Sequence, residues 1–146
     1  MRAFTLLECM AAVVLLALTA ATVAVRVSPS VESARMDDAR SIVLDADARA
    51  RLLAARGSAT TLVITDGRIL IRVGGDESPV VGRWLPEGVT ASLLTSDSRQ
   101  TVPELRIDRL GQSPDYILSV ESAGARSETL VAGLTGYAFD EEVSER

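Results

Sequence analysis

The beginning of the chain is almost uniformly apolar. Residues 9–25 contain no charged side chain, and residues 4–7 extend the run to the ~20 residues that a helix needs to cross a bilayer core. Glu8 is the one charged residue inside this stretch. An acidic side chain at the centre of a membrane helix raises the free energy of insertion by up to about 3 kcal/mol, so Glu8 is a candidate functional residue. We expect a transmembrane helix half over residues 4–27.

A second helical pattern follows Ser28-Pro29-Ser30. Over residues 31–56, apolar side chains recur at steps of three and four with charged side chains between them, which is typical of an amphipathic helix. Gly57 suits a left-handed helix stop. Because proline removes a helical hydrogen bond, we expect a kink near Pro29 within one continuous helix, whose amphipathic half covers residues 28–57.

After Gly57 the period changes to that of strands. Two β-branched, apolar runs at 60–65 and 68–73 flank Asp66-Gly67, the strongest short signal for a β-hairpin. Further strands are predicted at 80–85, 89–95, 104–108, 115–121 and 127–132, with a polar loop at 96–103 and a closing segment at 133–139. No helical pattern alternates with these strands, so the predicted fold class is α+β. We expect the long N-terminal helix to pack on a small antiparallel β-sheet or sandwich domain over residues 58–139, followed by an acidic tail at 140–146.

The composition argues against several functions, among them catalysis and metal binding. The chain has 146 residues, a formal net charge of −5 and no histidine, so it lacks the commonest general base and metal ligand. Its single Cys9 cannot form an intrachain disulfide or a zinc site and is interpreted as a small apolar residue. The acidic balance argues against nucleic acid as a partner. We therefore expect a protein that is not an enzyme and that has no cofactor and no metal site.

Three weaker candidates have simpler structural interpretations. The Gly-Gly-Asp-Glu loop at 74–77 offers oxygen ligands for Ca²⁺ but lacks a spaced ligand set. Neighbouring helix carboxylates, Asp37 and Asp38 among them, point apart and do not form an acid/base dyad. The lone Trp84 is interpreted as a core or packing residue rather than a ligand platform.

The order of residues at the N-terminus is informative. A small residue, Ala3, precedes Phe4-Thr5-Leu6-Leu7-Glu8 and the apolar helix, whereas a secretory signal has its small residue after the apolar run. This order resembles the type IV pilin-like proteins. The resemblance implies that residues 1–3 are a leader, that a prepilin peptidase cuts between Ala3 and Phe4, and that the new N-terminus of Phe4 is methylated. Ala3 stands where the family usually has glycine.

Glu8 has two interpretations. The resemblance implies that it is the acidic residue with which the family assembles its subunits. The amine that cleavage would leave on Phe4 lies one helical turn away and stabilises the carboxylate modestly, and a neighbouring subunit's amine would neutralise it more fully. Alternatively, Glu8 lies at headgroup depth and has no partner.

Later segments are similar to the H-type minor pseudopilins of type II secretion, namely 84–89, 107–114, 116–120 and 134–136. The resemblance implies a low-abundance subunit of a pseudopilus that supports protein export across the outer membrane. Its expected partners are other pseudopilin or pilin subunits, the prepilin peptidase and the inner membrane, with a cytoplasmic N-terminus and a periplasmic domain. The alternatives are a minor pilin of a type IV pilus and a membrane-anchored periplasmic binding module that does not polymerise. An anchored hydrolase is disfavoured because histidine is missing.

Overall fold

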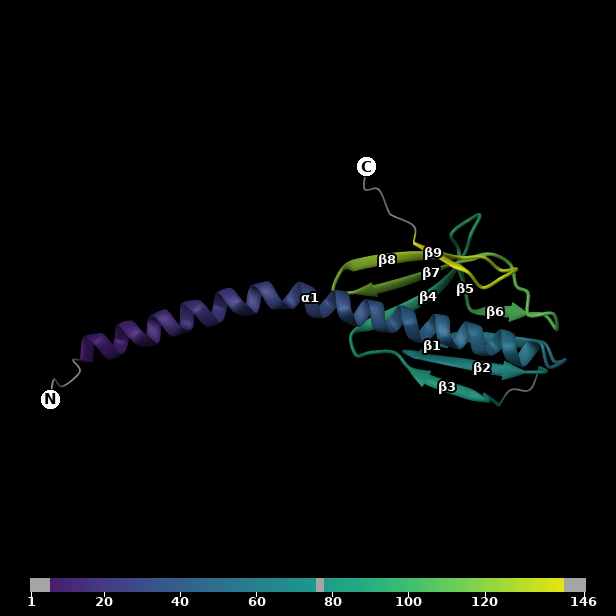
Figure 1. Ribbon diagram of the computed structural model, residues 1–146, viewed down its shortest axis with the longest axis horizontal. Coiled ribbons are helices and arrows are strands. Elements are labelled where there is room, and N and C mark those ends of the chain that lie inside the picture. Colours follow the sequence, from purple (N-terminus) through teal and green to yellow (C-terminus); the bar gives the residue numbers. More distant parts are fainter. Residues whose placement is uncertain (1–5, 76–77, 141–146) are drawn as a thin grey trace. The chain divides into compact units, whose positions relative to one another are not determined.

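The computed structural model describes residues 6–75 and 78–140, except for the side chains of residues 7, 20–29 and 140. One long helix, α1, runs over Leu6–Ala54 and is followed by strands (Figure 1). The chain divides into two compact units, Met1–Ala34 and Arg35–Arg146. The fold is α+β, as predicted.

The helix α1 is unbroken through Pro29, so the prediction of one continuous helix is confirmed. It ends at Ala54, three residues before the predicted boundary at residue 57, and a turn follows in which the Gly57 N–H donates to the Ala54 carbonyl at 2.9 Å. Gly57 has a φ of 105°, which a residue with a Cβ rarely adopts. The glycine is therefore the stop signal that the sequence indicated.

Nine strands form two antiparallel sheets within the described residues. The first sheet has the order β3-β2-β1-β6, and the second has the order β5-β4-β7-β8-β9. The strands are β1 (Thr60–Thr65), β2 (Arg68–Val73), β3 (Val81–Trp84), β4 (Val89–Thr95), β5 (Thr101–Val102), β6 (Glu104–Ile107), β7 (Tyr116–Ser122), β8 (Ala125–Val131) and β9 (Ala138–Asp140).

The predicted hairpin is present in the expected register. Thr65 pairs with Arg68, so Asp66 and Gly67 form the whole loop. Both loop residues have positive φ, 49° and 69°, as in the two-residue turn that matches the twist of antiparallel strands. The turn chemistry therefore sets which side chains of β1 and β2 share a face.

Two segments behave differently from their predictions. The stretch 96–103, expected to be a loop, contributes the short strand β5 to the second sheet. Pro103 is the single residue between β5 and β6, so the chain leaves one sheet and enters the other there. Trp84, interpreted as a core or packing residue, is not in the core: it is 62% exposed on the edge strand β3. The Arg68 guanidinium lies 3.5 Å from the centroid of its ring, and this stacking takes the place of burial.

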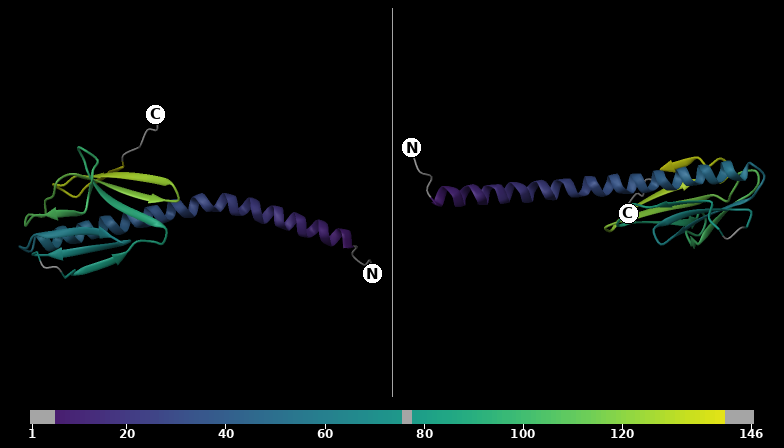
Figure 2. Two further views of the ribbon diagram at one scale, coloured as in Figure 1. Left: turned by 180° about the vertical axis from the view of Figure 1, so that it is seen from behind. Right: turned by 90° about the horizontal axis from the view of Figure 1, so that it is seen from below.

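One core joins the helix to both sheets within the unit Arg35–Arg146. Figure 2 shows both sheets on the same side of this part of α1. The buried helix positions are mostly small side chains: Ala39, Val43, Ala46, Ala50 and Ala54. The sheets contribute larger side chains: Leu62, Ile69, Ile71, Leu105, Ile107, Leu93, Leu118, Val120 and Val131. The first positions of the predicted apolar stripe, Val31 and Ala34, are exposed instead.

Candidate functional site

The first turns of α1 expose an apolar surface. Seven large apolar side chains are between 57% and 81% exposed and are called the apolar helix surface here: Leu6, Met10, Val13, Val14, Leu15, Leu16 and Leu18. Cys9 is exposed among them. A patch of this kind marks a site for contact with protein or lipid.

Two polar side chains, Glu8 and Thr19, are exposed along the same part of the helix. The Thr19 hydroxyl donates to the carbonyls of Leu15 and Leu16, at 3.0 and 2.9 Å. Such bonds to the carbonyls of the preceding turn give the hydroxyl partners within its own helix. Glu8 lies in the first turn of α1 with an exposed side chain, which places its carboxylate at the positive end of the helix dipole.

The remaining predicted site residues, Ala3 and Phe4, lie outside the described residues. Within residues 6–75 and 78–140, no helix has a stretch that is both long and apolar enough to cross a membrane. The predicted span of residues 4–27 includes two residues and several side chains that lie outside the described part.

A buried ion pair in the second half of α1 was not predicted from the sequence. Asp47 and Arg51 have side chains that are only 3% and 11% exposed, and Arg51 Nε donates to Asp47 Oδ2 at 2.7 Å. Position 47 lies beside the apolar stripe formed by Val43, Ala46 and Ala50. This position beside buried residues is the sequence signal from which the buried pair could have been predicted.

Arg51 also holds two loops that are distant in sequence. Its Nη1 donates to the carbonyls of Gly111 and Gly133, at 2.9 and 2.5 Å, and its Nη2 donates to Ser113 Oγ at 3.0 Å. The loops are bonded to each other as well, since the Gly133 N–H donates to Asp115 Oδ1 at 2.6 Å. A single guanidinium therefore fixes the end of α1 against the segments on either side of β7 and β8.

Tyr116 lies beside this ion pair. Its hydroxyl and Asp47 Oδ1 are buried, and neither has a hydrogen-bond partner among the described residues. Burial, and next the negative charge of Asp47, raise the pKa of the Tyr116 hydroxyl far above its ordinary value of 10.0. The folded domain therefore resists ionisation of this tyrosine, whereas the unfolded chain does not.

The raised pKa of Tyr116 gives the domain a pH dependence in the alkaline range. Its contribution to stability is complete below the unfolded pKa near 10, and it falls as pH rises above 10 because only the unfolded chain loses the proton. We expect the free energy of unfolding to fall by up to about 1.4 kcal/mol per pH unit there. Tyr116→Phe should remove that slope in urea titrations at pH 9 to 11. Tyr137→Phe, which changes an exposed ring, should keep it, and equal slopes in the two variants would contradict the assignment.

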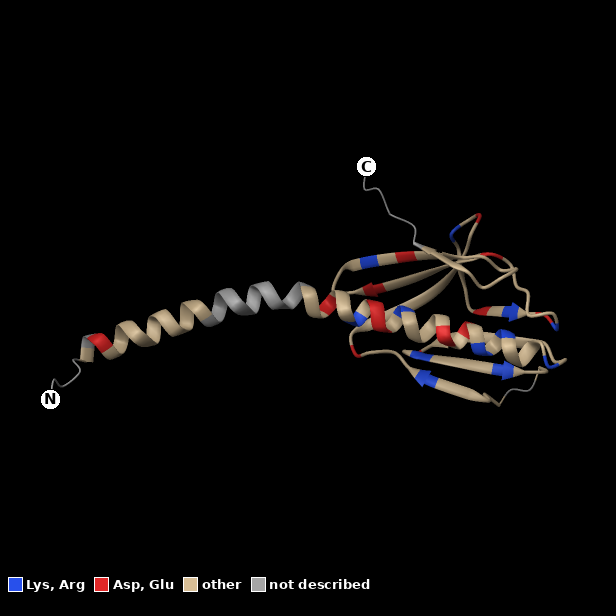
Figure 3. Cartoon of the chain, in the orientation of Figure 1, with Lys and Arg blue, Asp and Glu red and all other residues tan. Residues whose placement is uncertain are grey.

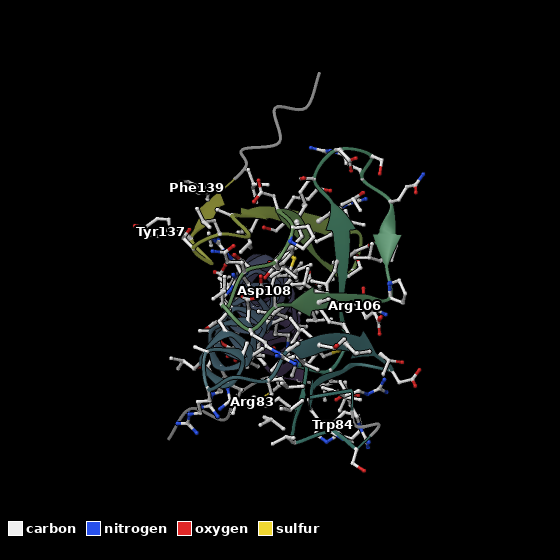
Figure 4. The ribbon with its side chains drawn as sticks, turned by 90° about the vertical axis from the view of Figure 1, so that its right-hand side faces the viewer. Arg83, Trp84, Arg106, Asp108, Tyr137 and Phe139 are labelled. Atoms are coloured by element: carbon white, nitrogen blue, oxygen red, sulfur yellow. The ribbon has the colours of Figure 1, made fainter. Side chains whose placement is uncertain are left out.

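Each segment that Arg51 joins also exposes a large apolar side chain. These residues are Leu52, Leu110, Leu134, Tyr137 and Phe139, which are 51% to 77% exposed. The rings of Tyr137 and Phe139 are 5.4 Å apart between centroids. Figure 4 shows this aromatic pair and Trp84 at opposite edges of the domain, so the domain has two separate exposed aromatic sites.

No metal centre is assembled in the part of the chain that the structure describes, where no three His, Cys, Asp or Glu side chains converge. Asp76 and Glu77 of the loop considered for Ca²⁺ lie outside that part. An open cleft of about 480 Å³ lies between Thr60, Thr61, Arg106 and the turn 108–114. The Asp108 carboxylate in this cleft accepts the N–H groups of Leu110 and Gln112, both at 2.9 Å, and so serves the turn.

The fold is that of a pilin-like protein. No protein-family model matches the sequence, and no curated protein matches it significantly. Among solved structures, the type IV minor pilin FimU of Pseudomonas aeruginosa is similar with a TM-score of 0.60 and 15% identity, over 78% of this chain and 93% of that chain. The minor pseudopilin EpsH from the Type 2 Secretion System of Vibrio cholerae has a TM-score of 0.49 and 14% identity, over 74% of this chain and 96% of that chain. The likeness to FimU confirms the pilin-like fold that the N-terminal residues suggested.

Proposed function

We propose that this chain is an assembly subunit of a pilin-like filament. One observation carries the proposal: an apolar helix surface with an acidic residue in its first turn is continuous, through α1, with a domain of pilin-like fold. Exposed apolar area of this extent needs a lipid or protein neighbour. In this proposal, residues 4–27 lie in the inner membrane before assembly and contact other subunits afterwards, and the domain lies in the periplasm.

The role proposed for Glu8 follows from electrostatics. A carboxylate near the lipid boundary is poorly solvated, and an amine held close to it favours its charged form. Cleavage between Ala3 and Phe4 would create such an amine on Phe4 of each subunit. Docking of one subunit's Glu8 near a neighbour's Phe4 amine would thus favour insertion into the filament over solitary residence in the membrane.

Glu8→Ala is the variant that tests this role. We expect the variant to insert in the membrane as the wild type does, and its recovery in sheared filament fractions to fall at least about tenfold, since a charge pair in a poorly solvated site is worth more than one on the surface. Quantitative immunoblotting of membrane and filament fractions measures both. Glu87→Ala, which removes an exposed carboxylate from the domain, is the control. Unchanged recovery of Glu8→Ala in filaments would refute the role.

Processing at Ala3 and Phe4 has its own measurement. Intact-mass spectrometry of the membrane-extracted chain should find loss of residues 1–3 and one added methyl group on Phe4. A chain that keeps residues 1–3 and is found alone in the membrane would instead identify a non-polymerising anchored module.

Two kinds of filament fit this subunit. The later sequence segments favour the pseudopilus of type II secretion, where the chain would be a minor pseudopilin. The likeness to the minor pilin FimU supports the second candidate, the type IV pilus. Affinity purification after crosslinking in the native cell discriminates them, because the co-purifying subunits belong to one apparatus or the other.

A further inference from the structure

The second sheet carries a row of apolar side chains on its face away from α1. Leu93 and Leu118, on β4 and β7, belong to the core that includes the helix. Neighbouring positions on a strand point to opposite faces, so the residues that follow or precede them face outward. These outward residues pair in register across four strands and are called the apolar ladder here: Leu94, Ile117, Leu130 and Phe139.

The apolar ladder is covered at one end and open at the other. Leu94 and Ile117 are buried although they face away from α1. Phe139, at the opposite end, is exposed, and its ring lies 5.4 Å from that of Tyr137 between centroids. Side chains on an outward sheet face become buried only where another segment lies over them. A segment of the domain therefore covers the β4 and β7 end of the ladder.

Residues 96–100, between β4 and β5, reach over this end and are called the strap here. Arg99 Nη1 in the strap donates to Glu128 Oε2 on β8 at 2.9 Å. Strand β7 lies between β4 and β8 in the sheet, and Glu128 pairs with Ser119 of β7. The ion pair of Arg99 and Glu128 therefore crosses the outward face of β7 beside Ser119. Figure 3 shows charged positions in this loop and along β8.

The backbone hydrogen bonds of the strap close within residues 95–100. The Thr95 N–H donates to the Gln100 carbonyl at 2.9 Å, and the Arg99 N–H donates to the Thr95 carbonyl at 3.0 Å. The Gln100 N–H also donates to Thr95 Oγ1, at 3.1 Å. None of these three bonds has to break when the strap moves away from β8, so the strap can move as one body.

Glu128 keeps a cation when the strap leaves. Its side chain is only 4% exposed, and a buried carboxylate without a cation would oppose release of the strap. Arg126 Nη2 lies 2.6 Å from Glu128 Oε1, and Arg126 belongs to β8 itself. Breaking the ion pair of Arg99 and Glu128 therefore leaves the buried charge paired, while the half-exposed Arg99 guanidinium becomes hydrated.

We propose that residues 96–100 are a movable strap, which opens by breaking the ion pair between Arg99 and Glu128 and so uncovers the apolar ladder. In the closed state the domain presents only the Phe139 end of the ladder. In the open state the four apolar side chains form one continuous surface across the sheet. The strap is thus a conformational switch within the domain. The inference goes beyond the proposed function and does not depend on it.

Labelling of an introduced cysteine measures the opening. Ser119 is 5% exposed and lies beside the ion pair, so Ser119→Cys, in the full chain with Cys9→Ala, reacts with N-ethylmaleimide when the strap is open. Glu128→Gln keeps the shape of the side chain and removes the charge that holds Arg99. We expect Glu128→Gln to raise the labelling rate about tenfold, between the effects of losing an exposed and a buried ion pair.

Matched variants separate opening of the strap from general loosening of the sheet. Ser122→Cys places a thiol on the same strand, at a serine that is 6% exposed on the opposite face, and Glu128→Gln should leave its labelling rate unchanged. Glu121→Gln removes an exposed carboxylate from the outward face and should not affect labelling at Ser119→Cys. Arg99→Ala breaks the ion pair from the strap and should reproduce the effect of Glu128→Gln. Thermal unfolding verifies that each variant folds.

Two results would overturn the inference. One is a labelling rate at Ser119→Cys that neither Glu128→Gln nor Arg99→Ala changes. The other is an equal acceleration at Ser119→Cys and Ser122→Cys, because the whole sheet would then have loosened. Acceleration at Ser119→Cys alone would establish the strap. Filament assembly does not enter this measurement, so the proposed function stands or fails separately.

Discussion

Arg51→Met is expected to lower the free energy of unfolding by about 3–5 kcal/mol, the range for removing one partner of a buried ion pair. The substitution leaves the Asp47 carboxylate, which is only 3% exposed, without its cation. It also removes the donor to the carbonyls of Gly111 and Gly133. Urea unfolding of the full chain in detergent, followed by far-ultraviolet circular dichroism, measures the change.

The neighbouring pair on the same helix provides the control. Arg49 Nε lies 3.2 Å from Asp45 Oδ2, at the same spacing of four residues, but both side chains are about half exposed. Water and salt screen such a pair, so Arg49→Met should cost at most about 1 kcal/mol. The double variant Asp47→Asn with Arg51→Met should be less damaging than Arg51→Met alone, because it removes the stranded charge. Equal losses for Arg49→Met and Arg51→Met would show that burial does not decide the effect.

Gly133→Ala is expected to destabilise the domain by about 3 kcal/mol or more, at or above the upper end for overpacked sites. A Cβ on Gly133 would lie 2.0 Å from the Ser113 carbonyl oxygen and 2.5 Å from the Pro114 carbonyl carbon. Both are backbone atoms, so no side-chain rotation relieves the clash. The backbone would have to shift to relieve the clash, and that shift would pull the Gly133 carbonyl away from Arg51 Nη1. The shift in the midpoint of urea unfolding measures the loss.

Gly82→Ala is the matched substitution. Its nearest contact would be a flexible one, the Cδ2 atom of Leu70 at 3.3 Å, and Gly82 lies on the edge strand β3. We expect a change within about 0.5 kcal/mol, typical of surface positions. A mild effect at Gly133, comparable with that at Gly82, would mean that the loops move apart freely, contrary to the role given to Arg51.

The elements of this fold that depend on local signals were predictable. Asp66-Gly67 specified a two-residue turn and so the register of β1 with β2, because both residues adopt positive φ at little cost. Gly57 ended the helix by the same property. The fold class, α+β with a long first helix, was predictable because the spacing of apolar residues within each segment indicates either a helix or a strand.

The features that depend on tertiary contacts were not predictable in the same way. Trp84 was interpreted as a core or packing residue, and it lies on an edge strand where Arg68 stacks on it. Strand β5 is too short to show an alternation of apolar and polar residues, and it is defined by its pairing with β4. The same distinction applies to the candidate site. Glu8 was predictable because it is the one charged residue in an apolar run. The hydrogen bonds of Arg51 were not, because they join it to residues 60 and 82 positions away.

The passage of the chain through Pro103 has a mechanical consequence. The pyrrolidine ring fixes one of the two soft torsions at this position, so the chain has less conformational freedom where it passes from β5 to β6. Both sheets also share their core with α1. We therefore expect a tensile load applied along the helix to reach both sheets together through this shared core.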